Sequence, residues 1–126
     1  MGARLFKIAE KVKNIISEEN ITEVIIEDIQ LQRTIGDNVT TFKILAEVIG
    51  VLYEMAYEIH IPINAVLASV WKSKLNIKGK DRSEQKRVAQ EYVKKNFGIS
   101  ATQDECDAIC IGCYACGGKV DMLTWE

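Results

Sequence analysis

Four cysteines and two aspartates lie close together near the end of the sequence, in the stretch DECDAICIGCYACGGK that covers residues 104–119. The cysteines are Cys106, Cys110, Cys113 and Cys116, and the aspartates are Asp104 and Asp107. Thiolates bind zinc or an iron–sulfur cluster, whereas carboxylates bind hard divalent cations through oxygen. The two sets of residues therefore indicate two different kinds of site.

The predicted local structure argues against one metal ion shared by the cysteines. Thr102 and Glu105 have the spacing of a capping box, which predicts that a helix begins at this point. On a straight helix, Cys106 and Cys113 would lie about 10 Å apart along the axis, but thiolates that share one zinc lie within roughly 4 Å of one another. We therefore expect Cys106, Cys110 and Cys113 to be small residues of the hydrophobic core.

A third carboxylate comes from a distant part of the sequence. The segment TEVIIED, residues 22–28, contains a β-branched apolar run, which predicts a strand that is buried on both faces and ends at Glu27. Asp104 and Asp107 lie on nearly the same side of their predicted helix, and Asp104 falls in its first turn, where acids are common. Carboxylates from a strand end and a helix start can hold divalent cations, and two such ions catalyse phosphodiester hydrolysis.

Basic residues are concentrated between the second predicted strand and the last helix. Seven of the 16 lysines and arginines fall within residues 72–87, namely Lys72, Lys74, Lys78, Lys80, Arg82, Lys86 and Arg87. Such a stretch can neutralise the phosphates of a nucleic acid. The formal net charge of −2 argues neither for nor against that partner.

The order of the predicted elements indicates the fold class. They are a helix over residues 3–19, the strand that ends at Glu27, a helix over residues 38–59, a strand in IPINAV (residues 61–66), a short helix through Trp71 and Leu75, a helix from Asp81 to Gly98, and a last helix after Thr102. This order is typical of an α/β layer in which helices cover a mainly parallel sheet.

Length and composition predict one globular domain over residues 1–126. Hydrophobic residues make up 48% and charged residues 27% of the chain, which is ordinary for such a domain. The most apolar long segment, residues 40–61, carries four charged side chains and is not expected to span a membrane. We find no secretory signal and expect a cytoplasmic location, or the host-cell cytoplasm if the protein is viral.

These motifs together resemble the RuvC-like Holliday-junction resolvases, and the phage-type and poxvirus-type branches are the closest. The resemblance rests on EVIIED, IPINAVLASVWKSKL, KGKDRSEQKRVAQEYV and DECDAICIGCYA, and it covers essentially the whole chain. It implies a ribonuclease-H-like fold and a homodimer that cuts branched DNA, the four-way junction, in recombination and repair. It also implies Mg²⁺ as the cofactor, with Mn²⁺ as a substitute.

The resemblance implies roles for the carboxylates. Glu27 matches the family's strand glutamate, and Asp104 and Asp107 match its two C-terminal aspartates, so all three are expected to be metal ligands and catalytic residues. The family pattern begins with a strand that carries another aspartate and with two further strands, whereas this sequence begins at the following helix. We therefore expect a partial nuclease domain that lacks the N-terminal β-hairpin region and that first aspartate.

The resemblance also assigns the basic residues and the long helix. Lys86 matches a catalytic lysine near the scissile phosphate, with Arg87 as the alternative one residue away. Lys72 matches a residue that contacts the junction backbone, and Lys80 and Arg82 are expected to bind DNA beside it. An ordinary solvated surface is the alternative for Lys72 and Lys86. The helix over residues 38–59 matches the family's dimer-forming helix.

Two alternatives to an endonuclease stay open at this point. One is a non-catalytic DNA-binding or oligomerisation module on the same fold, which would bind junctions without cutting them. The other is a cysteine-based metal or redox module at residues 106–116.

Overall fold

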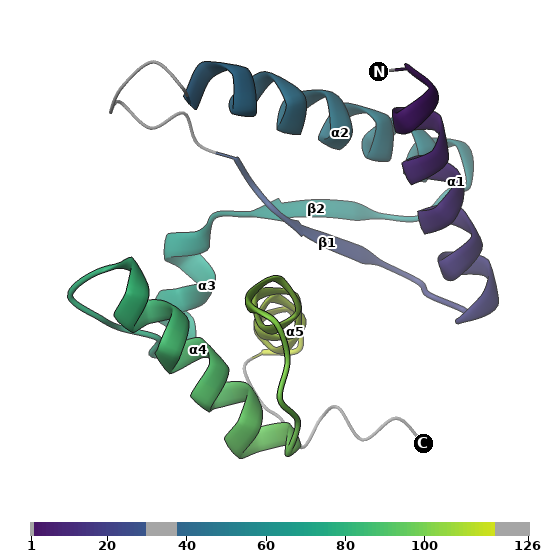
Figure 1. The fold of residues 1–126 in the computed structure, drawn as a ribbon. Coiled ribbons are helices and arrows are strands. Elements are labelled where there is room, and N and C mark those ends of the chain that lie inside the picture. The colour runs from purple at the N-terminus through teal and green to yellow at the C-terminus, as the bar shows by residue number, and fades with distance from the viewer. Residues whose placement is uncertain (1, 30–37, 118–126) are drawn as a thin grey trace. The chain divides into compact units, whose positions relative to one another are not determined.

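The structure is a computed structural model that describes residues 2–29 and 38–117 (Figure 1). Within these residues it contains five helices and two strands: α1 (Gly2–Glu18), β1 (Val24–Glu27), α2 (Asn38–Glu58), β2 (Ile63–Val66), α3 (Ala68–Lys74), α4 (Arg82–Phe97) and α5 (Gln103–Ala115). The two strands pair in a small parallel sheet. The fold is therefore mixed α/β, as the sequence predicts.

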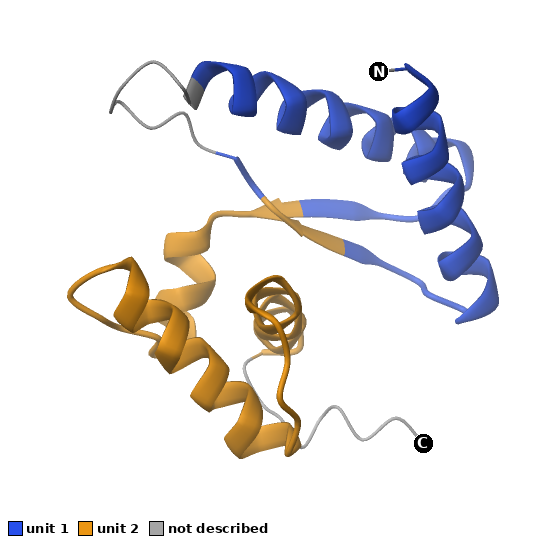
Figure 2. Cartoon of the chain, in the orientation of Figure 1, with its two compact units in different colours: residues 1–24, 28–64 blue, residues 25–27, 65–126 orange. Residues whose placement is uncertain are grey.

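The chain divides into two compact units, and the division passes through both strands (Figure 2). Unit 1 comprises residues 1–24 and 28–64, and unit 2 comprises residues 25–27 and 65–126. Unit 1 therefore holds α1 and α2, and unit 2 holds α3, α4 and α5. Every residue that the sequence assigns to metal or DNA binding belongs to unit 2.

Unit 1 is built from α1 packed on α2. Its buried side chains are Ile16 of α1 and Met55 and Ala56 of α2. Unit 1 also contains a hydrogen bond at the start of the strand pair, in which the Val24 amide donates to the Pro62 carbonyl over 2.9 Å. None of the helices within the described residues is both long enough and apolar enough to cross a lipid bilayer.

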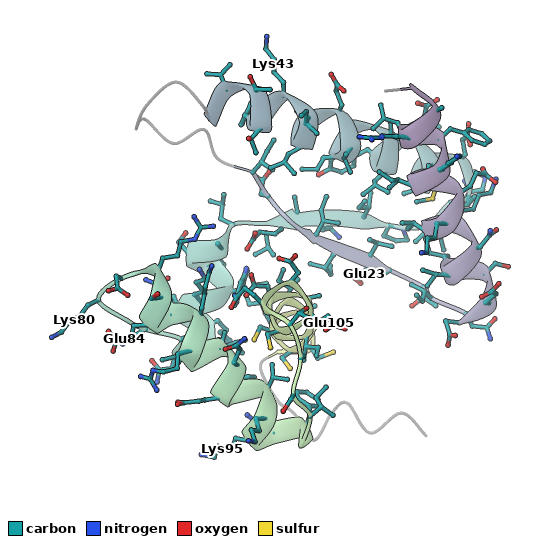
Figure 3. The ribbon with its side chains drawn as sticks, in the orientation of Figure 1. Glu23, Lys43, Lys80, Glu84, Lys95 and Glu105 are labelled. Carbon is teal, nitrogen blue, oxygen red and sulfur yellow. The ribbon has the colours of Figure 1, made fainter. Side chains whose placement is uncertain are left out.

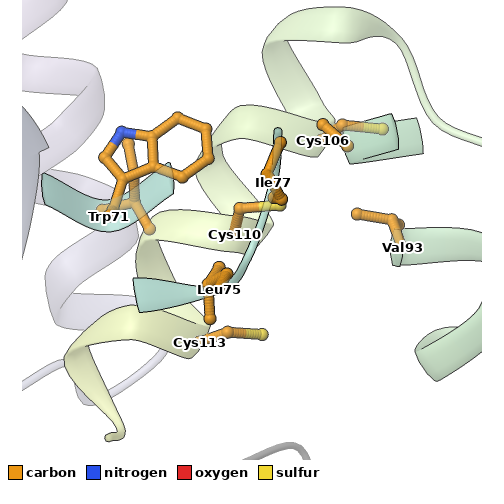
Figure 4. Packing of buried hydrophobic residues seen from close by; sticks show 9 residues of the cluster. Trp71, Leu75, Ile77, Val93, Cys106, Cys110 and Cys113 are labelled. Atoms are coloured by element: carbon orange, nitrogen blue, oxygen red, sulfur yellow. The ribbon is translucent and has the colours of Figure 1, made fainter. Parts of the chain in front are cut away.

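Unit 2 is organised around one apolar cluster that α3, α4 and α5 share (Figure 4). Its members are Trp71, Leu75, Ile77, Ala89, Val93, Cys106, Cys110, Ile111 and Cys113. Ile25 of β1 and Val66 of β2 pack against this cluster from the strands. Because the three cysteines of α5 are buried here, their prediction as core residues is confirmed.

The strand β1 is less buried than its apolar run predicts. Val24, Ile25 and Ile26 are only half-buried, and Glu27 is exposed. A continuous apolar run is fully buried when neighbouring strands and helices cover it on all sides. In the part of the chain that the structure describes, β1 has β2 as its one sheet neighbour, so its side chains keep some contact with water.

The start of α4 has an N-cap but not a complete capping box. The Asp81 carboxylate accepts from the Glu84 amide over 2.9 Å, as expected for an N-cap. Glu84, however, accepts from the amide of Lys80 and not from that of Asp81. The preceding loop turns so that the Lys80 amide is the donor within reach. At the other end, Gly98 adopts a left-handed conformation with φ of 69° and ends the helix, as predicted.

We expect the three core thiols to resist modification in the folded protein. Burial raises the pKa of Cys110 to about 12. At pH 8 this thiol is therefore ionised in roughly one molecule in ten thousand. Burial also raises the pKa of Cys106 and of Cys113. Cys116 is only partly buried and should react first with Ellman's reagent.

The measurement is the time course of thiol release at pH 8, with and without guanidinium. Cys116→Ser should remove the fast phase and leave three thiols that react only after unfolding. A fast reaction of Cys110 in the folded protein would contradict its place in the core.

Candidate functional site

Glu27 is oriented by a buried side chain of α3. The indole Nε1–H of Trp71 donates to Glu27 Oε1 over 3.0 Å, and Trp71 itself is 0% exposed. Glu27 lies on the same face of β1 as Ile25, which packs against the core, because alternate strand residues share a face. One oxygen of an otherwise exposed carboxylate is therefore held in place from inside unit 2.

The two aspartates stand on a helix whose start is fixed by its cap. Thr102 Oγ1 accepts from the Glu105 amide over 3.2 Å, and the Thr102 amide donates to Glu105 Oε1 over 2.9 Å. The predicted capping box is thus confirmed. Asp104 is exposed in the first turn, whereas Asp107 is half-buried one turn later.

Asp107 lies close to the packed side of α5. On a helix it lies roughly 60° from Cys110 and roughly 40° from Ile111, and both of these residues are buried. Asp107 thus lies between the cysteine stripe and Ile111. It is therefore at the edge of the core.

Gln103 is a residue of this site that the sequence analysis missed. Its Nε2 donates to Asp107 Oδ1 over 2.9 Å, a contact between successive turns that the spacing of four residues could have indicated. Its Oε1 is buried and has no hydrogen-bond partner within the described residues. A buried acceptor without a donor is costly, and water held by a bound ion would satisfy it.

The three predicted carboxylates do not surround a single point. Among residues 2–29 and 38–117, no three His, Cys, Asp or Glu side chains are close enough together to hold one ion. That statement covers Glu27, Asp104 and Asp107, and it also covers the cysteines. A Mg²⁺ site nevertheless commonly uses only one or two carboxylates, with water and phosphate oxygens as the other ligands.

Two of these carboxylates share one feature with metal ligands. Glu27 and Asp107 each have one oxygen held by a donor side chain, which is the usual arrangement around metal-binding carboxylates. The unpartnered Gln103 oxygen beside Asp107 suits a hydrated ion. Asp104 is exposed in the first turn of the helix and forms no group of three with other possible ligands among the described residues.

Lys72 is held by two neighbours in unit 2. Its Nζ lies 5.5 Å from the centroid of the Trp71 ring, within the range of a cation–π interaction. The same Nζ donates to Gln85 Oε1 of α4 over 3.3 Å. Lys72 is half-buried as a result, which is not the environment of a freely solvated lysine.

The other predicted DNA-binding residues lie on the surface. Lys80, at the tip of the loop before α4, is exposed, and so are Arg82 and Lys86 at the start of that helix (Figure 3). Arg87 forms an ion pair with Glu91 one turn further along. An exposed ion pair of this kind is weak and leaves other guanidinium donors available, so Arg87 stays the alternative to Lys86.

No protein-family model and no curated protein matches this sequence. The function of the site has to be inferred from its own geometry. Three residues that the sequence assigns to chemistry, Glu27, Asp107 and Lys72, are each held by a polar side chain. The holding residues are Trp71, Gln103 and Gln85, none of which has a functional role in the sequence prediction.

We expect Glu27→Ala to speed the exchange of the Trp71 indole proton with water by at least about tenfold, because the N–H loses its acceptor. The measurement is the Trp71 Nε1–H signal in a ¹H–¹⁵N NMR spectrum, assigned by comparison with Trp71→Phe. Glu23→Ala, a change of an exposed glutamate before β1, is the matched control and should leave the exchange rate unchanged. An equal rate in Glu27→Ala and the wild-type protein would show that the bond does not form in solution.

Proposed function

We propose that this chain is a metal-dependent endonuclease of the RuvC-like type that acts on branched DNA. One observation carries the proposal: Glu27 and Asp107, on different elements that pack against one core, each have an oxygen held by a donor side chain. Orientation of this kind is expected of metal ligands, because the ion requires fixed oxygen positions. A ribonuclease-H-like arrangement of the elements is part of the same proposal.

The proposed cofactor is Mg²⁺, or Mn²⁺ in its place. Glu27 and Asp107 would hold it, with water and phosphate oxygens as its other ligands. A bound ion of this kind supplies positive charge to the oxygens of a phosphodiester during its hydrolysis. The chain's own contribution is to fix the ligands, through Trp71 for Glu27 and through Gln103 for Asp107.

The proposed substrate is a four-way DNA junction, bound through its phosphates. Lys72, Lys80, Arg82 and Lys86 would neutralise those phosphates, so binding should weaken steeply as salt is raised. The exposure of the last three and the fixed position of Lys72 support this assignment. Lys86 is the lysine proposed to lie near the scissile phosphate.

The proposal includes a homodimer formed through α2. A stripe of six α2 residues, spaced alternately by four and by three, is exposed in unit 1: Val39, Lys43, Ala46, Gly50, Tyr53 and Tyr57. This is the spacing with which one helix packs along another. Gly50 and Ala46 leave room at its centre, since a Cβ at Gly50 would meet nothing within 4 Å. Two copies would provide two carboxylate sites, one for each strand of a symmetric cut.

A second candidate function is DNA binding without cleavage. The observation that favours it is that no three carboxylates within the described residues meet at one point. Such a module would bind junctions through the same basic residues. Metal ions would not change its affinity for the junction.

Cleavage of a labelled four-way junction, with and without Mg²⁺ or Mn²⁺, separates the two candidates. We expect paired symmetric nicks only with metal, and we expect Asp107→Asn to lower their rate by at least about 100-fold with junction binding changed less than about threefold. Glu105→Gln is the matched control, because it removes the same charge two residues away on the same helix and preserves the capping box.

Each result of this experiment decides between the candidates. Junction binding by the wild-type chain without nicks would establish the non-catalytic function. Metal-dependent nicks that persist in Asp107→Asn would remove Asp107 from the site.

A further inference from the structure

Gln85 links the lysine of α3 to the loop before α4. Its Oε1 accepts from Lys72 Nζ over 3.3 Å, and its Nε2 donates to the Gly79 carbonyl over 3.3 Å. Both bonds are partly buried within unit 2. One neutral side chain therefore joins three successive segments of the basic stretch.

The chemistry of the two partners fixes the orientation of this amide. An ammonium group only donates hydrogen bonds, and a carbonyl oxygen only accepts them. Rotating the amide by half a turn would place its NH₂ against Lys72 and its oxygen against the Gly79 carbonyl, which would break both bonds. Gln85 is thus held in the single orientation that presents an acceptor to Lys72.

The loop lies tightly against the first turn of α4 at this point. A Cβ on Gly79 would come within 2.8 Å of the Gln85 backbone nitrogen, closer than real Cβ contacts. Glycine is therefore required for this approach. The acceptor that Gln85 offers to Lys72 is supported by a backbone that has little room to shift.

Lys72 and the predicted metal ligand Glu27 both contact the Trp71 side chain. The Trp71 indole donates its N–H to the Glu27 carboxylate, and its ring lies under the Lys72 ammonium. The same side chain therefore contacts both the carboxylate and the cation. A lysine ammonium has three N–H donors, and Gln85 takes one of them. The other donors are available to the oxygens of a phosphate near Glu27.

We infer that Gln85 is a positioning residue that orients Lys72 for a DNA phosphate beside the Glu27 carboxylate. The inference rests on the proposed function, since it names a residue that prepares the phosphate-binding surface of the same site. Gln85 itself does not touch the DNA. Its whole effect on binding passes through Lys72.

A double-mutant cycle tests this role. The measurement is the fluorescence anisotropy of a labelled four-way DNA junction in EDTA over a range of salt concentrations, for wild type, Lys72→Met, Gln85→Leu and the double variant. We expect Lys72→Met to raise Kd by about fivefold to tenfold. We expect Gln85→Leu to raise it by about threefold in the wild-type background and by less than about 1.5-fold in the Lys72→Met background, because the two residues act as one unit.

The salt dependence adds a readout that a merely structural role would not change. Gln85→Leu removes no charge, yet the slope of log Kd against log salt should fall toward that of Lys72→Met, which loses up to about 0.9 for one phosphate contact. Gln90→Leu, the same replacement at an exposed position of α4, is the control and should change neither Kd nor the slope. Gln85→Ala serves in place of Gln85→Leu if circular dichroism shows that the leucine variant is not folded.

The possible outcomes separate this inference from the proposed function. An equal cost of the Gln85 change in both backgrounds would overturn the positioning role while junction binding by the wild-type chain stands. Failure of the wild-type chain to bind the junction at all would overturn the proposed function, and the positioning role with it.

Discussion

A fully buried indole has to pack its ring against apolar side chains and still give its N–H an acceptor. Trp71 satisfies both requirements: its ring belongs to the core of unit 2, and its N–H reaches Glu27 at the end of β1. Lys72 lies over the same ring. The core therefore determines where a carboxylate and an ammonium group stand, and the candidate site depends on the burial of this side chain.

Three of the cysteines help to form that core. Cys106, Cys110 and Cys113 are small and buried, so α5 can pack on both α3 and α4. Burial raises the pKa of Cys110 to about 12, and burial next to Cys113 raises the pKa of Tyr92 to about 12 as well. These groups stay neutral near pH 7, and no charged side chain is buried among the residues that the structure describes.

The sequence predicts local features of this fold well, because the signals for them are local. The apolar periodicity of α2, the Thr102 cap and the single stripe of cysteines each depend on residues a few positions apart. The bond between Trp71 and Glu27 joins residues that are 44 positions apart, so no spacing rule could reveal it. The partial burial of β1 was likewise hidden, because it depends on which elements cover the strand.

The candidate site shows the same division between local and distant contacts. A spacing of four residues on one helix could have revealed Gln103 as the partner of Asp107, but Gln85 meets Lys72 only because the loop between α3 and α4 folds back. The charged residues of the candidate site could be identified from the sequence. The neutral residues that orient them became visible only in the structure.

The proposed metal site requires that Glu27 and Asp107 bind the same cation. Titration of ¹⁵N-labelled protein with small amounts of Mn²⁺ tests it directly, because the paramagnetic ion broadens the NMR signals of nearby amides. We expect amides around Glu27 and around Asp107 to broaden together, and we expect Asp107→Asn to weaken the broadening at both places. Broadening around one residue alone, or broadening at Glu27 that Asp107→Asn leaves unchanged, would contradict it.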